Sequence, residues 1–299
     1  MKLVLDQPAA KKPTLKRRVF RALRKPILVL LLLAGCVWGG MKLWENVREQ
    51  VAIGPEYQLD PNQIEITPPP AWIHSDIRAQ VIRDAGWGPS LSLLDERLTV
   101  KIAQAFQLHP WVAKVTRVSK TRTAGVQVEL EYRRPVAMVE VDGGVLAIDG
   151  EATVLPSEDF SADEARLYPR IAKIQTGPRG PTGTRWGDTG VAAGAQLALF
   201  LRESWPTLQL RRIIPHVGSS TDTPDRITFS IVTKGDRELT WGKLPGKEAP
   251  GELPAAEKLA RLKRHIETTG SLEQGDPLPS NPLSPVQNRT ATLPLNKES

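Results

Sequence analysis

The chain has 299 residues, 40% of them hydrophobic, which is enough to bury at least one core and excludes a wholly disordered protein. Its net charge of +7 is localised, because residues 1–25 hold nine Lys and Arg against the single acid Asp6, whereas the other 274 residues hold 31 basic and 32 acidic side chains. The single cysteine, Cys36, excludes an intrachain disulfide and a cysteine zinc cluster.

An apolar segment directly follows the basic tail at 1–26. Residues 27–44 contain one charged residue, Lys42, and a helix of 18 residues is about 27 Å long, close to the ~30 Å hydrocarbon core of a bilayer. The positive-inside rule then explains the cations of the tail as a cytoplasmic flank, without a nucleic-acid partner. The sequence therefore predicts a single transmembrane helix at 27–44, with the rest of the chain extracytoplasmic.

The same segment has a second interpretation. Leu33-Ala34-Gly35-Cys36 resembles a bacterial lipoprotein signal motif, in which the cysteine becomes the lipidated first residue. The residues after Cys36 remain apolar, and the charged lead is long for a signal peptide, which favours an uncleaved anchor. Lipidation of Cys36 is the alternative.

Residues 45–60 are predicted to be a linker, and 61–141 a small α/β domain. Pro68 to Pro70 forbid a helix near the start of this domain, and strict alternation of apolar and polar residues at 125–132 predicts a half-buried strand. The expected elements are an extended stretch at 64–73, a helix from Ser75 or Asp76 to Gly86, a helix from Ser92 to Pro110, and strands at 111–118 and 125–132.

Residues 142–270 are predicted to be a β-rich domain that ends in a helix. Its Asp142-Gly143 and Asp149-Gly150 pairs supply the positive-φ residues of tight hairpins, and the Gly-rich stretch 177–190 is expected to be a flexible surface loop. The further expected elements are a helix at 191–204, strands at about 208–217, 226–234 and 237–243, and a helix at 254–270. Frequent proline and few apolar groups predict disorder at 271–299.

Catalytic arrangements are missing from the sequence: it has no nucleophile elbow, no His-Glu-x-x-His, no P-loop and no Cys–His pair. Glu129 and Glu131 lie on the polar side of a predicted strand and should face solvent. The four histidines have no partner at metal-ligand spacing. We therefore predict a protein that is not an enzyme and has no metal, cofactor or small-molecule substrate.

Four short motifs follow one another between residues 109 and 150. They are Pro110-Trp111-Val112 at the start of a strand, Val126-Gln127-Val128-Glu129, Pro135-Val136-Ala137, and the Asp149-Gly150 turn. In this order they resemble the FtsQ/DivIB family of bacterial cell-division proteins. The chain departs from the family after the 254–270 helix, where a closing strand is expected and SLEQGDPLPSNPLSP cannot pair as a strand.

The resemblance implies an α+β fold with a single N-terminal transmembrane helix, a POTRA-like β-α-α-β-β domain, and a β-rich domain with a C-terminal helix. It also implies a non-catalytic, bitopic scaffold at the division site of the bacterial inner membrane. Its partners would be FtsL/FtsB-like bitopic division proteins and septal peptidoglycan synthases, bound by strand addition and helix contacts.

The predicted partner contact lies at the 237–243 strand, which becomes a free sheet edge if the closing strand is missing. The residues expected there are Leu239, Trp241, Leu259 and Leu262; the expected POTRA motif residues are Pro110, Trp111, Val112 and Pro135. The alternative function is a POTRA-bearing envelope or secretion protein that binds unfolded polypeptides by strand addition, with the 111–118 strand as a second candidate edge. The sequence shows none of the repeated modules that such proteins carry.

Overall fold

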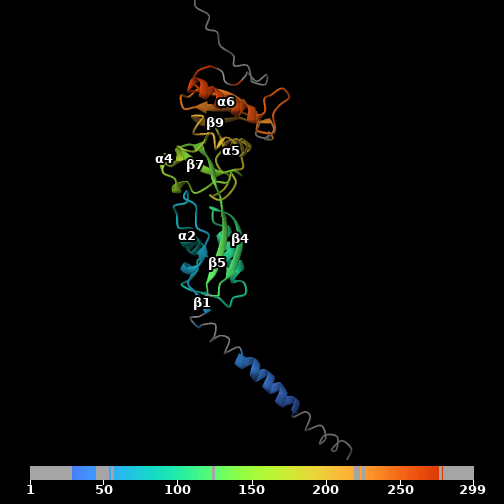
Figure 1. The fold of residues 1–299 in the computed structure, drawn as a ribbon. Helices are drawn as coiled ribbons and strands as arrows, with labels where there is room; N and C mark the ends of the chain where they lie inside the picture. Colours follow the sequence, from blue (N-terminus) through green and yellow to red (C-terminus); the bar gives the residue numbers. More distant parts are fainter. Residues whose placement is uncertain are drawn as a thin grey trace, which may run out of the picture.

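The computed structural model describes residues 29–44, 54, 57–122, 125–218, 223, 226–275 and 278. Figure 1 shows two α+β domains stacked end to end, with a separate helix at 29–44 drawn in blue. In the part of the chain that is described, no helix is both long and apolar enough to cross a membrane. The predicted transmembrane helix at 27–44 is therefore wrong.

The first domain is a three-stranded sheet packed against two helices. The sheet order is β2-β5-β4, with β2 parallel and β4 antiparallel to β5. A two-residue pair, β1 with β3, lies beside it. The elements are β1 (Gln58–Leu59), η2 (Pro61–Gln63), β2 (Glu65–Ile66), α2 (Ile77–Asp84), β3 (Leu91–Ser92), α3 (Leu98–Gln107), β4 (Val112–Lys120) and β5 (Val126–Tyr132).

The two helices of the first domain begin for different reasons. The Asp76 carboxylate caps α2 by accepting from the Ala79 N–H at 3.0 Å, and Gly86, at φ +62°, ends it. The second helix begins at Leu98, six residues later than the sequence predicts. Ser92 does not cap this helix as expected, because residues 91–92 form the short strand β3, which pairs with β1.

The second domain is a six-stranded sheet in the order β11-β10-β9-β8-β6-β7. The short β8 pairs in parallel with both β6 and β9, while all the other pairs in this sheet are antiparallel. Its elements are β6 (Pro135–Val141), β7 (Gly144–Asp149), η3 (Ser157–Asp159), α4 (Ala162–Ala165), β8 (Arg170–Ile171), α5 (Thr189–Leu201), β9 (Leu210–His216), β10 (Thr228–Thr233), β11 (Glu238–Gly242) and α6 (Ala255–Thr269). Helices α5 and α6 contribute to one hydrophobic core together with the strands.

The boundary between the domains lies earlier than predicted. β6 pairs with β7 and β8 in the six-stranded sheet, not with the sheet of the first domain. The chain therefore changes domain at Arg133 and Arg134, between β5 and β6, rather than after residue 141. Pro135 stands at the first position of β6, where a strand tolerates proline.

Two segments expected to lack fixed structure pack against the second domain. In the 177–190 loop, Trp186 is fully buried, and its backbone N–H donates to Ala152 O at 2.8 Å. At the start of the predicted tail, Leu272 is buried, and the Arg237 guanidinium donates to its carbonyl at 2.9 Å. Residues 276, 277 and 279–299 of the tail lie outside the described residues, as does the basic segment 1–26.

Candidate partner-binding site

The predicted free edge is present in the structure. β11 is the outer strand of the six-stranded sheet, and within the described residues only β10 pairs with it. The turn before β11 is held by residues 271–275, because Gly235 N–H donates to Glu273 Oε1 at 3.1 Å and Arg237 donates to the carbonyls of Leu272 and Gly275. These contacts lie at one end of β11 and leave its outer backbone edge without a strand partner.

The four side chains predicted to touch a partner lie together, but they form core. Leu239, Trp241 and Leu262 are buried, and Leu259 is half-buried against the same cluster. The Trp241 ring contacts Phe200 of α5, with ring centroids 6.2 Å apart. These residues therefore hold β11 and α6 in place. A partner at this edge would meet the backbone of β11 and its exposed side chains, which are Glu238 and Thr240.

A buried ion pair fixes the connection between β11 and α6. Lys258 Nζ lies 2.5 Å from Glu252 Oε1 and 5.2 Å from the centroid of the Trp241 ring. The Glu252 carboxylate also accepts from the backbone N–H groups of Lys243 and Ala249, at 2.8 and 2.9 Å. Burial alone would raise the pKa of Glu252, but these hydrogen bonds together with Lys258 hold the pKa below its ordinary value.

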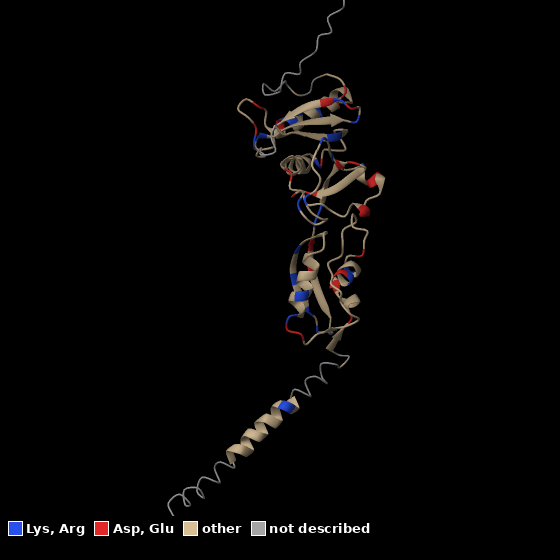
Figure 2. Cartoon of the chain, turned by 180° about the vertical axis from the view of Figure 1, so that it is seen from behind, with Lys and Arg blue, Asp and Glu red and all other residues tan. Residues whose placement is uncertain are grey.

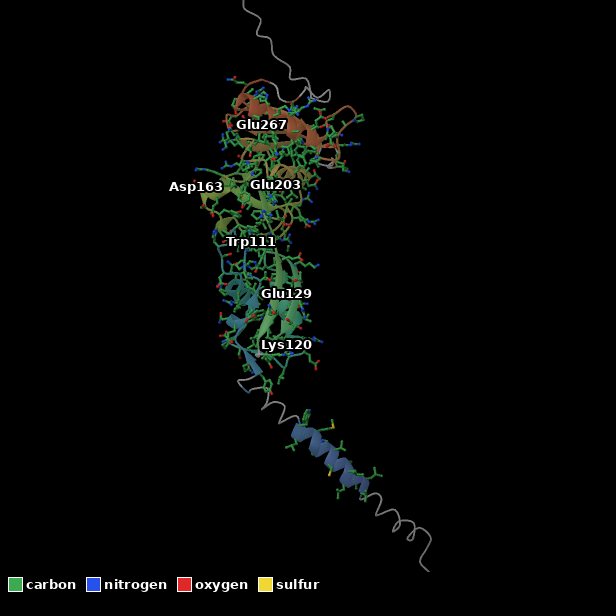
Figure 3. The ribbon with its side chains drawn as sticks, in the orientation of Figure 1. Trp111, Lys120, Glu129, Asp163, Glu203 and Glu267 are labelled. Carbon is green, nitrogen blue, oxygen red and sulfur yellow. The ribbon has the colours of Figure 1, made fainter. Side chains whose placement is uncertain are left out.

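The predicted POTRA motif residues occupy the junction between the domains. Trp111 and Val112 are buried, and Figure 3 shows Trp111 at the level where the two domains meet. Gly183, in the loop of the second domain, has φ +92°, and a Cβ at this position would lie 3.3 Å from Pro110 Cα. A side chain at 183 would therefore be strained and crowded against Pro110.

Asp159 links the two domains through its side chain and its backbone. Its Oδ2 atom accepts from Trp111 Nε1 at 2.6 Å and from Ser75 Oγ at 2.9 Å, and His74 Nδ1 lies 2.7 Å from its carbonyl oxygen. The neighbouring Phe160 packs against Trp111, with ring centroids 6.0 Å apart. We define Asp159, Trp111, Ser75 and His74 as the interdomain latch.

A second link lies where the chain passes between the domains. Trp72 Nε1 donates to Arg133 O at 3.2 Å, and the Arg134 guanidinium lies 5.6 Å from the centroid of the Trp72 ring. Arg133 also pairs with Asp149 at 2.8 Å, and both side chains are largely buried. The Oδ1 atom of Asp149 also accepts from the backbone N–H groups of Glu151 and Thr153. Asp149 therefore stabilises the turn that follows it and, through Arg133, the connection between the two domains.

His109 is a buried neutral histidine beside this junction. The Trp111 backbone N–H lies 3.2 Å from Nδ1, so Nδ1 is the acceptor and Nε2 carries the proton that is donated to Gln80 Oε1 at 2.7 Å. Burial lowers the pKa of His109, and the carboxylates of Asp84 and Asp159 only partly oppose that shift.

We predict that acidification destabilises the protein through His109. Because its pKa is lower in the folded state, the unfolded chain binds the proton first, and stability falls as pH drops below about 6.5, by at most about 1.4 kcal/mol per pH unit. Urea unfolding at several pH values should show that the free energy of unfolding falls less steeply with decreasing pH for His109→Gln than for the wild type. Identical pH profiles would contradict the assignment.

The remaining predicted site residue, Cys36, lies in the helical segment 29–44 and is an exposed free thiol. The described residues contain no group of three or more His, Cys, Asp or Glu side chains that could hold a metal ion. Figure 2 shows basic and acidic residues interspersed over both domains. Asp159 and Lys258 are the important polar residues that sequence reasoning missed. An acid next to an aromatic residue, and a lysine within an amphipathic helix, are ordinary patterns that give no signal of burial.

Comparison with known proteins found no family model that matches the chain and no curated protein with significant sequence similarity. The resemblance to the FtsQ/DivIB family therefore stays a prediction that depends on the motifs of residues 109–150.

Proposed function

We propose that this protein is a non-catalytic scaffold of the bacterial division complex, which binds FtsL/FtsB-like division proteins by strand addition at β11 and connects them with septal peptidoglycan synthases. The observation that carries the proposal is the outer edge of β11 in the six-stranded sheet, with which no described residue pairs as a strand. An edge strand presents unpaired N–H and C=O groups, which a strand of another protein can pair with. The buried Leu239 and Trp241 side chains keep this edge fixed before a partner arrives.

The arrangement at β11 suits recognition through the backbone. Exposed and buried side chains alternate along β11. Every second side chain of a paired partner strand would therefore lie beside Glu238 or Thr240. Glu238 lies 3.9 Å from Lys173, a contact between exposed groups that a partner could replace at little cost. Affinity would come from main-chain hydrogen bonds and selectivity from the side chains beside them.

Photocrosslinking in living cells tests this proposal. A photoreactive residue at Thr240, on β11, should capture an FtsL/FtsB-like protein, whereas one at Thr228 should not. Thr228 lies on the same face of the sheet but belongs to β10, which has a strand on either side. A fluorescent fusion should gather at midcell, and depletion should give filamentous cells. Uniform envelope fluorescence, or equal capture from both positions, would contradict the proposal.

A second candidate function has a specific observation in its favour. β4 is an edge strand of the first domain, nine residues long, and in the described chain only β5 pairs with it. A POTRA-bearing secretion protein would use such an edge to bind unfolded polypeptides. Three exposed basic residues of β4 count against this use, because charged side chains on an edge strand commonly prevent unspecific strand pairing: Lys114, Arg117 and Lys120. Capture of unfolded outer-membrane polypeptides from Lys114, with none from Thr240, would favour this alternative.

A further inference from the structure

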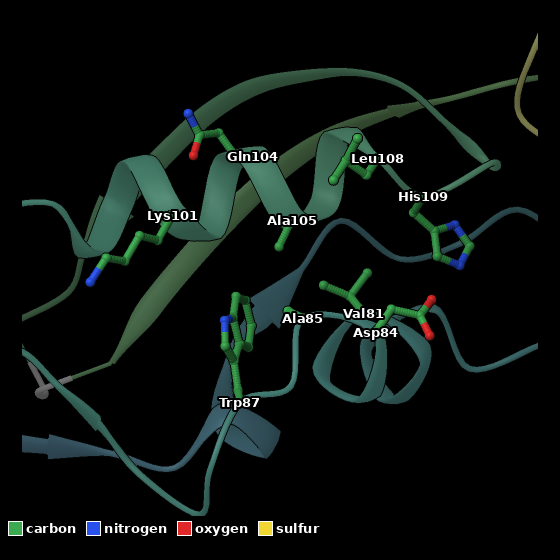
Figure 4. A pocket seen from close by; sticks show the side chains of 9 residues that line it. All are labelled: Val81, Asp84, Ala85, Trp87, Lys101, Gln104, Ala105, Leu108 and His109. Carbon is green, nitrogen blue, oxygen red and sulfur yellow. The ribbon is translucent and has the colours of Figure 1, made fainter.

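A groove lies between α2 and α3, on the side of the first domain away from β5. Its cavity has a volume of about 290 Å³ and is lined mainly by apolar groups, among them Val81, Ala85, Trp87, Ala105 and Leu108. Figure 4 shows the Trp87 ring standing below Ala105, with Val81 and Ala85 beside it and Leu108 at the upper rim. This volume is at the lower end for a small-molecule site, so it suits one or two large side chains.

Beside the groove, α3 exposes two aliphatic side chains, Val100 and Leu108, on either side of the polar Gln104. Val100, Gln104 and Leu108 are spaced by four residues and therefore share one side of the helix. Val100 is 53% exposed and Leu108 is 84% exposed, although both are large aliphatic residues. Exposed aliphatic side chains next to an apolar cavity are typical of a protein interaction surface.

The charges at the rim select the partner. Lys101 lies at one end, but its ammonium group is already paired with Asp95 at 2.7 Å. At the other end is Asp84, which forms no ion pair with any described residue, beside the neutral His109. The unbalanced charge of the groove is therefore negative, and its complement is a cation.

We propose that the groove between α2 and α3 is a docking site for an amphipathic helix of a partner protein, which inserts one bulky apolar side chain into the cavity and places a Lys or Arg beside Asp84. A helix fits because two neighbouring helices offer a groove between their ridges. The apolar side of the docked helix covers Val100 and Leu108, and its basic residue replaces the missing partner of Asp84. This site is distinct from the β11 edge and does not depend on the function proposed there.

Two synthetic helical peptides of about 16 residues test the site. Both have the same apolar face with a central Phe. The Arg peptide has Arg residues on either side of this face, and the Glu peptide has Glu residues at the same positions. Titrating each labelled peptide with the purified full chain, followed by fluorescence anisotropy, should show at least about tenfold tighter binding of the Arg peptide. Equal affinities, or no binding of the Arg peptide, would overturn the proposal.

Matched variants separate the groove from a general charge effect. Asp84→Lys should lower the affinity for the Arg peptide by about tenfold or more. Ala85→Trp should abolish binding of this peptide, because the new side chain fills the cavity. The controls are Glu267→Lys and Ala256→Trp, which make the same changes at exposed positions of α6 and should leave affinity within about twofold. Lysine at position 84 suits the C-terminal turn of α2, so folding is retained. Equal losses in variants and controls would show that the peptide binds elsewhere.

Discussion

Replacing Asp159 by alanine is expected to loosen the connection between the two domains and to lower the free energy of unfolding by about 2–3 kcal/mol. The substitution removes the acceptor of the fully buried Trp111 indole N–H and of the Ser75 hydroxyl. An unsatisfied buried donor is costly because no water replaces the lost acceptor. Urea unfolding of the full chain measures the loss, and small-angle X-ray scattering should show a broader distribution of interdomain distances.

The matched control for this variant is Asp163→Ala. Asp163 is an acid only four residues away, but its side chain is 91% exposed and its ion pair with Arg166 lies on the surface. Its removal should change stability by no more than about 0.5 kcal/mol. Asp159→Asn should fall between the two, because its amide oxygen can still accept from Trp111 and Ser75 but lacks the negative charge that strengthens both hydrogen bonds. If Asp159→Ala and Asp163→Ala have equal stability and equal scattering curves, the latch does not hold the domains.

Replacing Lys258 by alanine is expected to cost about 3–5 kcal/mol, because it leaves the Glu252 carboxylate buried without its counter-ion. It also removes the side chain that covers the Trp241 ring. The part of this stability due to Glu252 is present above the carboxyl's unfolded pKa and is lost as pH falls, since the folded pKa is lowered. Urea unfolding at neutral and acidic pH measures both effects.

A double variant distinguishes a lost charge from lost packing. Lys258→Met with Glu252→Gln removes both charges and keeps the volume of both side chains, and the amide oxygen can still accept from one of the two N–H groups, that of Lys243 or that of Ala249. We expect it to recover at least half of the loss, as is common when a buried ion pair is replaced as a unit. A double variant that is as unstable as Lys258→Ala would contradict the ion-pair explanation.

The long elements of the chain could be predicted from its sequence. Strict alternation marks β5, and apolar residues at helical spacing mark α2 and α6, because each of these elements buries one side against a core. The junction could not be predicted in this way. Asp159 and Trp111 are 48 residues apart, and their contact depends on how the two domains stack. Short pieces were also missed: β8 and β3 have two residues each, too few for a periodic pattern.

The apolar residues predicted to contact a partner lie beside the β11 edge, but they belong to the core. Their place on an edge strand predicts Leu239 and Trp241 as contacts, but an edge strand still has one covered face, and these side chains lie on that face.

The two-residue strand β8 has a consequence for the order of assembly. It joins the β6–β7 hairpin to the β9–β10–β11 meander, and both of its pairings are parallel. The hairpin and the meander are each local in sequence, whereas the seam between β8 and β9 must wait for the whole connection through α5. During synthesis, the β6–β7 hairpin is therefore made before β9, β10 and β11. If β8 pairs with β6 before β9 is synthesised, Arg170 and Ile171 form a free sheet edge, which β9 closes in the complete sheet.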